Sequence, residues 1–413
     1  MTATALPLSN MLFPLAHLRG GGRFVLHDIK VMAWIEQMAQ YKLGPHVFFR
    51  DLFPAGVIAS SGGAFATYAA FANDPNDPSR PRYNMTAFTD VFRDNLHAFL
   101  PKEDADTRRA LIQFLIRQLS QFMPIISRRP LLTASFTHAM DIAAYGAAWA
   151  LNAPTEIKDF IHAHNRDARK ILRAYKDDVS TSRQSAATVL HDLIGDTKFS
   201  DTNSNIVITS QKLGANNSLE NDHFAFIQPD HLRQDQDAPT TFQINGDHRF
   251  VDAILATTAV PLVFTMDDDK HIDTSPFMQG PDMVATFKRC CHFGSDLGYV
   301  RFGNINGSLA DTLPHGMRGV LMSIAGMFSD SARNTLRETV GPQNAHFLEY
   351  RLPSDFKGTR SFLDPSPKQM DILVATSDKL IADDHQRLGL LTDTLILAYK
   401  ARQARMHPQR AVA

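Results

Sequence analysis

The stretch Val57-Ile58-Ala59-Ser60-Ser61-Gly62-Gly63-Ala64-Phe65-Ala66 decides how this chain is expected to fold. It begins as the end of a short apolar run, passes through four small residues and continues in an alanine-rich helical pattern. A strand that turns directly into a helix needs small residues at the corner, because the two elements nearly touch there. A serine at such a corner is held exposed above the positive end of the helix. The stretch therefore predicts a strand, a sharp turn and a helix.

Ser61 is the candidate nucleophile at this corner. Ala59 lies two residues before it and Gly63 two residues after it, which is the spacing of a nucleophile elbow with Ala in place of the first Gly. Ser60 is the rival, but the residue two positions before it is Ile58, which is bulky for a tight corner. The alternative is a turn of small residues without chemistry, so the rest of the chain has to decide.

Three consecutive glycines, Gly20, Gly21 and Gly22, are the second candidate element. They follow a short apolar run and precede a helical stripe over 25–42. With a strand at 54–59, this order predicts a βαβ unit in which the glycines and the serine corner lie at the C-terminal ends of adjacent parallel strands. Neither phosphate-binding glycine pattern is present. An oxyanion hole does need such glycines, because backbone N–H groups must reach the developing negative charge with no Cβ in the way.

Composition excludes several classes of protein. The 413 residues carry a net charge of −1, so there is no basic excess to neutralise the phosphates of a nucleic acid. The only cysteines, Cys290 and Cys291, are adjacent and fit neither a disulfide nor a zinc site, so we expect buried apolar side chains. No apolar run approaches the roughly 20 residues that span a bilayer, and no secretory signal is apparent at the N-terminus. We expect a cytoplasmic protein without a metal or cofactor.

The remaining segments predict how the domain is built. Residues 84–178 are mostly helical by pattern, as an insertion packed over the sheet or a lid. Within them, 156–178 predicts a basic amphipathic helix, which is either a solvated face or a contact with anionic lipid headgroups. Further expectations are a turn-rich surface loop at 73–81, a strand at 205–210 followed by a loop rich in Asn, Asp and Gln, a helix at 250–264 ended by Pro261, and a C-terminal helical stretch at about 367–405.

Asp273 is the candidate general base. It follows Ile272 at the end of a predicted short strand and precedes small residues, where a carboxylate could reach back to the serine. The aspartates at 267–269 lack the alternating spacing and distal Glu of a calcium loop, so they predict a solvated turn. A histidine base is the alternative. Its candidates are His271, His292, His315 and His346.

Taken in order, these pieces resemble the patatin-like phospholipase family over roughly residues 11 to 390. The motifs that carry the resemblance are the Gly20–Gly22 loop, the elbow Ala59-Ser60-Ser61-Gly62-Gly63, the segment from Ile194 to Asp201, the helix end from Ala256 to Phe264, Asp273 in the place of the family's catalytic Asp, and the tail from Phe362 to Ser366. The departures from the family pattern are Arg19 for the usual Asp before the glycines, Phe24 for the usual Arg after them, and Asp273-Thr274-Ser275 for Asp-Gly-Gly or Asp-Gly-Ala.

The resemblance implies an α/β patatin-type three-layer fold, with a mostly parallel central sheet flanked by helices and a helical insertion. Its expected organisation is an N-terminal tail over 1–10, an acyl hydrolase domain over 11–390, and a C-terminal helix and tail over 391–413.

The resemblance also implies a lipid acyl hydrolase that cuts ester bonds of phospholipids or related acyl lipids at a membrane surface, with peripheral membrane association. Ser61 would attack the ester and Asp273 would accept its proton, without a histidine. An acyl-enzyme would form, and N–H groups of Gly20, Gly21 and Gly22 would stabilise the oxyanion. The second hypothesis is a catalytically weak protein of the same fold that binds lipid or a protein partner.

Overall fold

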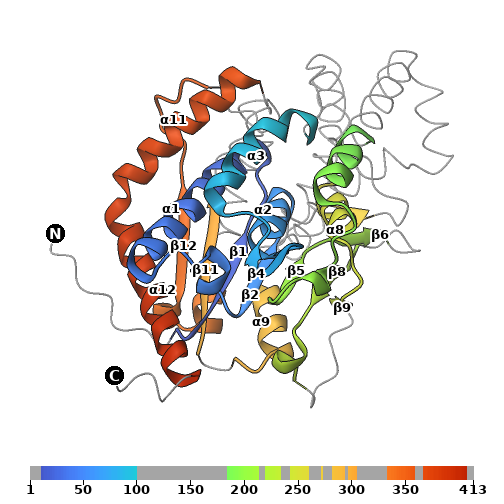
Figure 1. Ribbon diagram of the computed structural model, residues 1–413, viewed down its shortest axis with the longest axis vertical. Helices are drawn as coiled ribbons and strands as arrows, with labels where there is room; N and C mark the ends of the chain where they lie inside the picture. Colours follow the sequence, from blue (N-terminus) through green and yellow to red (C-terminus); the bar gives the residue numbers. More distant parts are fainter. Residues whose placement is uncertain are drawn as a thin grey trace, which may run out of the picture.

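The computed structural model describes residues 11–99, 184–213, 219–233, 242–259, 271–272, 281–293, 296–304, 333–358 and 366–406. Within these residues the chain forms a seven-stranded central sheet with helices on both faces (Figure 1). The predicted α/β class with a mostly parallel sheet is therefore confirmed. The predictions for 156–178, for the aspartates at 267–269 and for most of the insertion at 84–178 lie outside the described residues.

The strand order of the central sheet is β12-β11-β1-β2-β5-β8-β9. Every neighbouring pair is parallel except β5 and β8, which are antiparallel. Leu18, the last residue of β1, pairs with Ala59, the last residue of β2, so the two strands end side by side. The strands are β1 (Phe13–Leu18), β2 (Gly56–Ala59), β5 (Ile206–Ile208), β8 (His223–Phe226), β9 (Phe242–Ile244), β11 (Leu297–Asn304) and β12 (Ala345–Tyr350).

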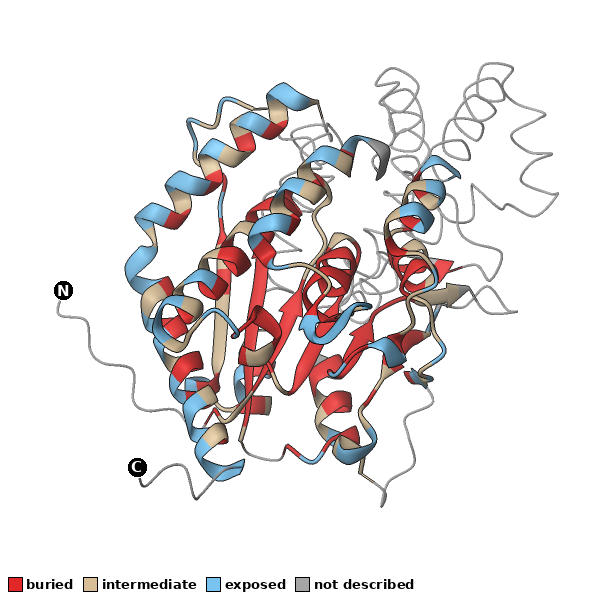
Figure 2. Cartoon of the chain, in the orientation of Figure 1, coloured by how far each residue is buried: buried red, intermediate tan, exposed pale blue. Residues whose placement is uncertain are grey.

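Two hydrophobic cores lie on the two faces of this sheet, because successive side chains of a strand point to opposite sides. In β1, Ala16 and Leu18 belong to the first core and Leu15 to the second. Figure 2 shows the strands as a buried layer between helices whose outer surfaces are exposed. The first core is covered by α1 (Val25–Leu43), α2 (Gly62–Phe71), α3 (Met85–Phe99), α8 (Phe250–Thr257), α11 (Pro367–Asp383) and α12 (His385–Met406), and the second by α9 (Pro281–Cys290) and a helix at 333–340.

Helix α1 confirms the helix predicted over 25–42 and is anchored by a buried carboxylate. Glu36 is buried and accepts the backbone N–H groups of Phe49 at 2.8 Å and Met85 at 2.9 Å. Burial raises the pKa of Glu36 to about 7, although both hydrogen bonds favour the charged form. Through these two bonds Glu36 ties α1 to the turn before β2 and to the start of α3.

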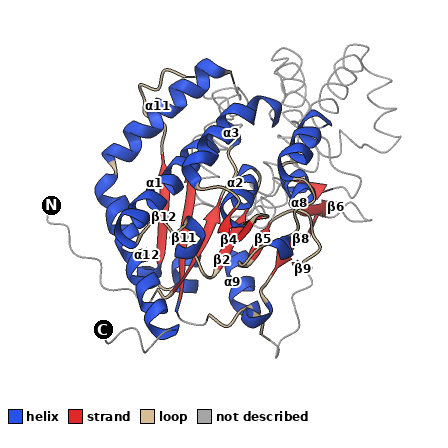
Figure 3. Cartoon of the chain, viewed as in Figure 1, coloured by secondary structure: helices blue, strands red, loops and turns tan. Residues whose placement is uncertain are grey.

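Two segments that were predicted as loops contain strands (Figure 3). The segment 73–81 forms a hairpin of β3 (Asn73–Asp74) and β4 (Asp77–Pro81), in which the prolines of β4 lie in an edge strand that needs few donors. The polar region after β5 forms β6 (Gln211–Leu213), β7 (Leu219–Asn221), β8 and β9. β6 also pairs with β10 (His271–Ile272). These strands have two to four residues, too few for alternation to distinguish them from a polar loop.

One helical prediction needs correction at its end, and another is confirmed but consists of two helices. Helix α8 ends at Thr257, four positions before Pro261, and its last turn tightens where the Ala259 N–H bonds the Ala256 carbonyl at 3.3 Å. The C-terminal stretch is two helices, α11 and α12, separated at Asp384. The division expected after residue 390 falls within α12, whose buried leucines belong to the first core.

Two expectations from composition can be compared with the structure. Cys290 and Cys291 are both buried and form no disulfide, as predicted. Burial raises the pKa of both thiols, so they are inert apolar side chains. Of the helices within the described residues, none combines the length and the apolar character needed to cross a bilayer.

Candidate active site

Ser61 occupies the sharp turn between β2 and α2, as the elbow pattern predicts, but within the described residues it is buried, at 7% exposure, and not exposed as expected. It is the N-cap residue of α2, with φ 48° and ψ −128°. Among the described residues it is the only non-glycine residue with a positive φ. Such a conformation is costly for a residue with a Cβ and persists only where the surrounding structure imposes it, which is typical of functional sites. The structure thus distinguishes Ser61 from Ser60, whose backbone is not strained in this way.

The glycine loop lies directly against this serine. A Cβ added to Gly20 would lie 2.2 Å from Ser61 Cβ and 2.8 Å from Ser61 Oγ, so no larger residue fits there. Gly22 has φ 55°, in the left-handed region that favours glycine, and begins a short 3₁₀ turn that leads into α1. There is more space around Gly21, because a Cβ added there would meet only Phe24 Cβ, at 3.8 Å. The loop and the elbow therefore form one site, as predicted from their strand ends.

The small residues of the elbow are explained by the end of β1. A Cβ on Gly63 would lie 2.3 Å from the Leu18 carbonyl oxygen, and the Ser60 N–H donates to the same oxygen at 3.1 Å. A Cβ on Gly62 would lie 2.7 Å from Val25 Cγ2. Helix α2 thus starts in backbone contact with β1, and the elbow sequence is the one that permits this approach.

Thr257 holds the backbone of Ser61 in place, a role that the sequence analysis did not assign. The Ser61 N–H donates to Thr257 Oγ1 at 2.8 Å, and the Thr257 hydroxyl donates to the Thr209 carbonyl at 2.6 Å. The elbow is thereby fastened to α8 and to the end of β5. The sequence does hint at this contact. The helix end from Ala256 to Phe264 is rich in Ala and Thr, and such small side chains indicate close packing against a neighbour.

The Thr257 contact also limits which groups can stabilise an oxyanion. Because the Ser61 N–H is engaged, the candidate donors among the described residues are Gly62 and the glycine loop. Gly62 is the first residue of α2, where helix geometry leaves the N–H without an intrahelical partner, and it lies at the positive end of the helix dipole. Gly20 of the Gly20–Gly22 loop packs directly against the Ser61 side chain.

We expect Thr257→Val to lower kcat for ester hydrolysis by about tenfold to 100-fold, because the Ser61 N–H loses its acceptor and the strained backbone loses a restraint. Thr257→Ser keeps the hydroxyl and should stay within about threefold of wild type. Steady-state kinetics on one soluble ester measures both. Equal losses in the two variants would mean that the methyl group, and not the hydrogen bond, carries the effect.

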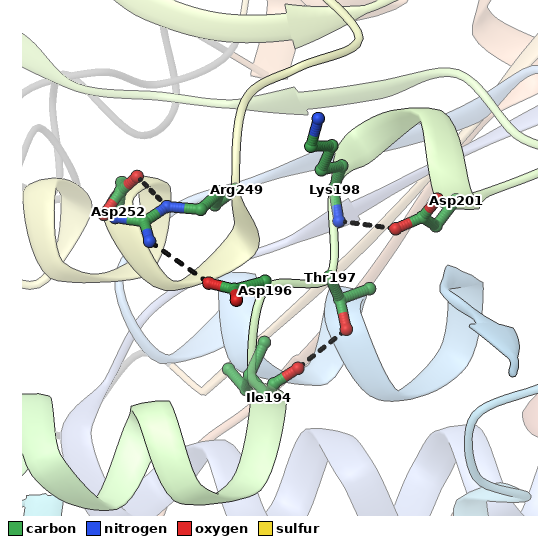
Figure 4. A network of polar contacts seen from close by, with 7 residues as sticks. All are labelled: Ile194, Asp196, Thr197, Lys198, Asp201, Arg249 and Asp252. Atoms are coloured by element: carbon green, nitrogen blue, oxygen red, sulfur yellow. Dashed lines mark hydrogen bonds and ion pairs between the residues drawn. The ribbon is translucent and has the colours of Figure 1, made fainter.

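A polar network anchors the start of α8 (Figure 4). Arg249, the N-cap residue of α8, contacts both carboxylate oxygens of Asp252 at 2.8 Å and reaches Asp196 at 3.3 Å. The Phe250 N–H donates to the Thr197 carbonyl at 3.0 Å. These exposed ion pairs contribute little stability individually, but the Asp196 contact and the Phe250 hydrogen bond join the start of the helix that carries Thr257 to the turn at 195–198. The other residues drawn are Ile194, Lys198 and Asp201.

Two of the candidate bases, Asp273 and His315, lie outside the described residues. His271 lies in β10, which packs against α8, and its Nε2 is 3.2 Å from Asp222 Oδ2. His346 lies in β12, which β11 and β1 separate from the elbow strand. The His292 N–H donates to the carbonyl of His231, which contacts Asn205 at the opposite end of β5 from Thr209. Of the described histidine candidates, His271 is therefore the one whose neighbouring elements adjoin the site.

Among the described residues, no group of three or more His, Cys, Asp or Glu side chains lies close enough together to hold a metal ion. No protein-family model matches the sequence, and no curated protein matches it significantly. The assignment of a function therefore depends on the geometry of Ser61 and its glycine loop.

Proposed function

We propose that this protein is a lipid acyl hydrolase of the patatin-like type, a serine carboxylic-ester hydrolase in which Ser61 is the nucleophile. The observation that carries the proposal is the strained backbone of Ser61 with Gly20 packed against its Cβ and Oγ. A plain strand-to-helix turn has no use for a serine at a positive φ, whereas a nucleophile does, because this conformation presents the hydroxyl beside N–H donors.

The mechanism follows from these positions. The Ser61 hydroxyl attacks the ester carbonyl while Asp273, the base assigned by the resemblance, takes its proton. N–H groups of Gly62 and the Gly20–Gly22 loop stabilise the oxyanion, and each such donor is typically worth about 3 kcal/mol of barrier. The alcohol leaves with the proton from Asp273, and the acyl-enzyme remains. Water, deprotonated by the same carboxylate, then attacks the acyl-enzyme, and the Ser61 oxygen takes back the proton from Asp273 as the fatty acid leaves.

An aspartate can act as this base only in a desolvated position. Its unperturbed pKa of about 3.9 makes it a weak base in water. Burial beside the elbow would raise that pKa, because burial disfavours the charged carboxylate. The rate should therefore fall as pH decreases, because acid protonates the carboxylate that acts as the base.

A serine-reactive fluorophosphonate tests the nucleophile without assuming a substrate. The serine oxygen displaces fluoride and forms a stable bond to phosphorus. We expect wild type and Ser60→Ala to be labelled at residue 61 and Ser61→Ala to remain unlabelled, as read by intact mass and peptide mapping. Absence of labelling in folded wild type would instead favour the second hypothesis, a catalytically weak protein that binds lipid or a partner.

A further inference from the structure

A cluster of arginines lies on the second-core face of the sheet, beside the glycine loop. It consists of Arg19, which follows β1, Arg301 in β11 and Arg333 in the helix at 333–340. Arg301 pairs with His17 in the β1–β11 register, so Arg301 and Arg19 come from the same end of neighbouring strands. A Cβ on Gly303 would lie 3.3 Å from Arg19 Cδ, which places the Arg19 side chain over β11. We call these three residues the arginine cluster.

Arg301 is buried without satisfied donors. It is 1% exposed, and neither Nη1 nor Nη2 has a hydrogen-bond partner. Within the part of the chain that the structure describes, its ion pair joins Nε to Glu349 Oε1 at 3.3 Å. A guanidinium carries five N–H donors, and a buried charge that lacks partners is expensive. Natural structures retain such a group where something else supplies the acceptors.

Arg301 and Arg19 have few acidic neighbours among the described residues. Arg301 shares the carboxylate of Glu349 with Arg333. Asp28 acts on Arg19, but burial raises the pKa of Asp28 well above its usual range, which favours the neutral acid. Within the described residues, the positive charges of Arg301 and Arg19 are thus met by one shared carboxylate.

The neighbouring titratable groups add no negative charge. His17 is hydrogen-bonded to the Tyr299 hydroxyl on the same face. Burial, with smaller effects from Arg301 and Arg19, lowers the pKa of His17 well below its usual value, and burial raises the pKa of Tyr299. Both side chains are neutral near pH 7. Burial and the proximity of Arg301 also lower the pKa of Arg19 to about 9, as expected for cations that repel each other.

The cluster lies close to the proposed nucleophile. Arg19 directly precedes Gly20, the residue that packs against Ser61. Strand β11 is separated from the elbow strand β2 by β1 alone, so the two strands are about 10 Å apart. An anion at Arg301 and an ester at Ser61 can thus belong to one small molecule.

We propose that Arg301 and Arg19 form an anion subsite that binds a phosphate group beside the elbow. Phosphate offers several acceptor oxygens and a negative charge, which match the unsatisfied donors of Arg301 and the positive charges of Arg301 and Arg19. The source is either the phosphodiester of a phospholipid or free phosphate. The inference that this phosphate belongs to a substrate rests on the proposed function. The inference that the subsite binds phosphate does not.

Thermal unfolding of Arg301→Met and Arg402→Met tests the subsite. Arg402 is a matched control, since it is also buried but donates to the carbonyls of Leu12 at 2.7 Å and Asp51 at 2.8 Å. We expect inorganic phosphate to raise the Tm of wild type by several degrees above a chloride control of equal ionic strength. Arg402→Met should have a lower Tm and keep that phosphate shift.

Arg301→Met should lose the phosphate shift and unfold, in chloride, at the wild-type Tm or above, because an uncompensated buried charge has been removed. A purely structural arginine would give the opposite result, a lowered Tm with the phosphate shift retained. That result, or a wild-type protein that does not respond to phosphate, would overturn the subsite.

Hydrolysis identifies the source of the phosphate. If the headgroup binds, Arg301→Met lowers the ratio of kcat/KM for phosphatidylcholine to that for uncharged diacylglycerol at least tenfold, and glycerophosphocholine reproduces the Tm shift. If only inorganic phosphate shifts Tm and the ratio is unchanged, the subsite holds free phosphate. A phosphate shift without any hydrolysis by wild type refutes the proposed function and keeps the subsite. If wild type hydrolyses the lipid but shows no phosphate shift that depends on Arg301, the proposed function stands and the subsite is refuted.

Discussion

Ser61→Ala should lower ester hydrolysis by about 10⁴-fold or more, and Asp273→Asn should cause a loss of similar size. Removal of a nucleophile or its base leaves only the contributions of binding and of the oxyanion donors, so losses of this order are expected. Because the two residues act as one unit, the double variant should be no worse than either single variant. Turnover of a short-chain nitrophenyl ester and of mixed phospholipid vesicles measures all three.

Two control variants make this result specific. Ser60→Ala should retain activity within a fewfold of wild type, since Ser60 does not hold the strained position. His271→Gln should retain most activity if the base is Asp273, whereas a loss as large as that of Ser61→Ala would show that His271, paired with Asp222, is the base. Activity that survives Ser61→Ala but disappears in Ser60→Ala would mean that the elbow has been assigned to the wrong serine.

Gly20→Ala should lower kcat/KM by about 10³-fold while the central sheet stays folded. The added methyl carbon would overlap Ser61 Cβ and crowd its Oγ, at 2.2 and 2.8 Å. Relief of this clash requires the glycine loop to move away from Ser61, which withdraws the oxyanion donors and displaces the hydroxyl. Loss of one donor costs about 10²-fold to 10³-fold, and displacement of the nucleophile adds to it.

Gly21→Ala is the matched control for this effect. Its added Cβ meets only Phe24 Cβ at an ordinary contact distance of 3.8 Å, so activity should stay within about tenfold of wild type. Circular dichroism and thermal unfolding of both variants separate a local displacement from loss of the fold. If both substitutions are equally harmful, the loop tolerates no side chain at all and the contact of Gly20 with Ser61 is not the reason.

The elbow is held in place by contacts from three other parts of the chain. The end of β1 supplies the Leu18 carbonyl, which receives the Ser60 N–H. Helix α8 supplies the Thr257 hydroxyl, and the end of β5 supplies the Thr209 carbonyl behind it. The strained φ of Ser61 is maintained by these contacts together, so a change in any of them should affect catalysis before it affects stability.

Predictions from the sequence succeeded where the signal was local. The glycines of the loop and the elbow, the strand and helix on either side of each, and the parallel pairing of β1 with β2 all follow from small residues and hydrophobic periodicity over short stretches. The strands after β5 and the hairpin at 73–81 were missed because two to five residues carry too little periodicity. The end of α8 was misplaced because an Ala- and Thr-rich run continues past it without a polar break.

The sequence by itself determined that a serine lies at a sharp strand-to-helix corner near three glycines, because a close approach of backbones leaves its mark in consecutive small residues. Only the tertiary structure decided that Gly20 touches Ser61, that Thr257 holds the Ser61 backbone from 196 positions away, and that Arg301 is buried with open donors. These contacts depend on which strands become neighbours and on where helices end. No short stretch of residues records such an arrangement, since it arises from the packing of the whole sheet.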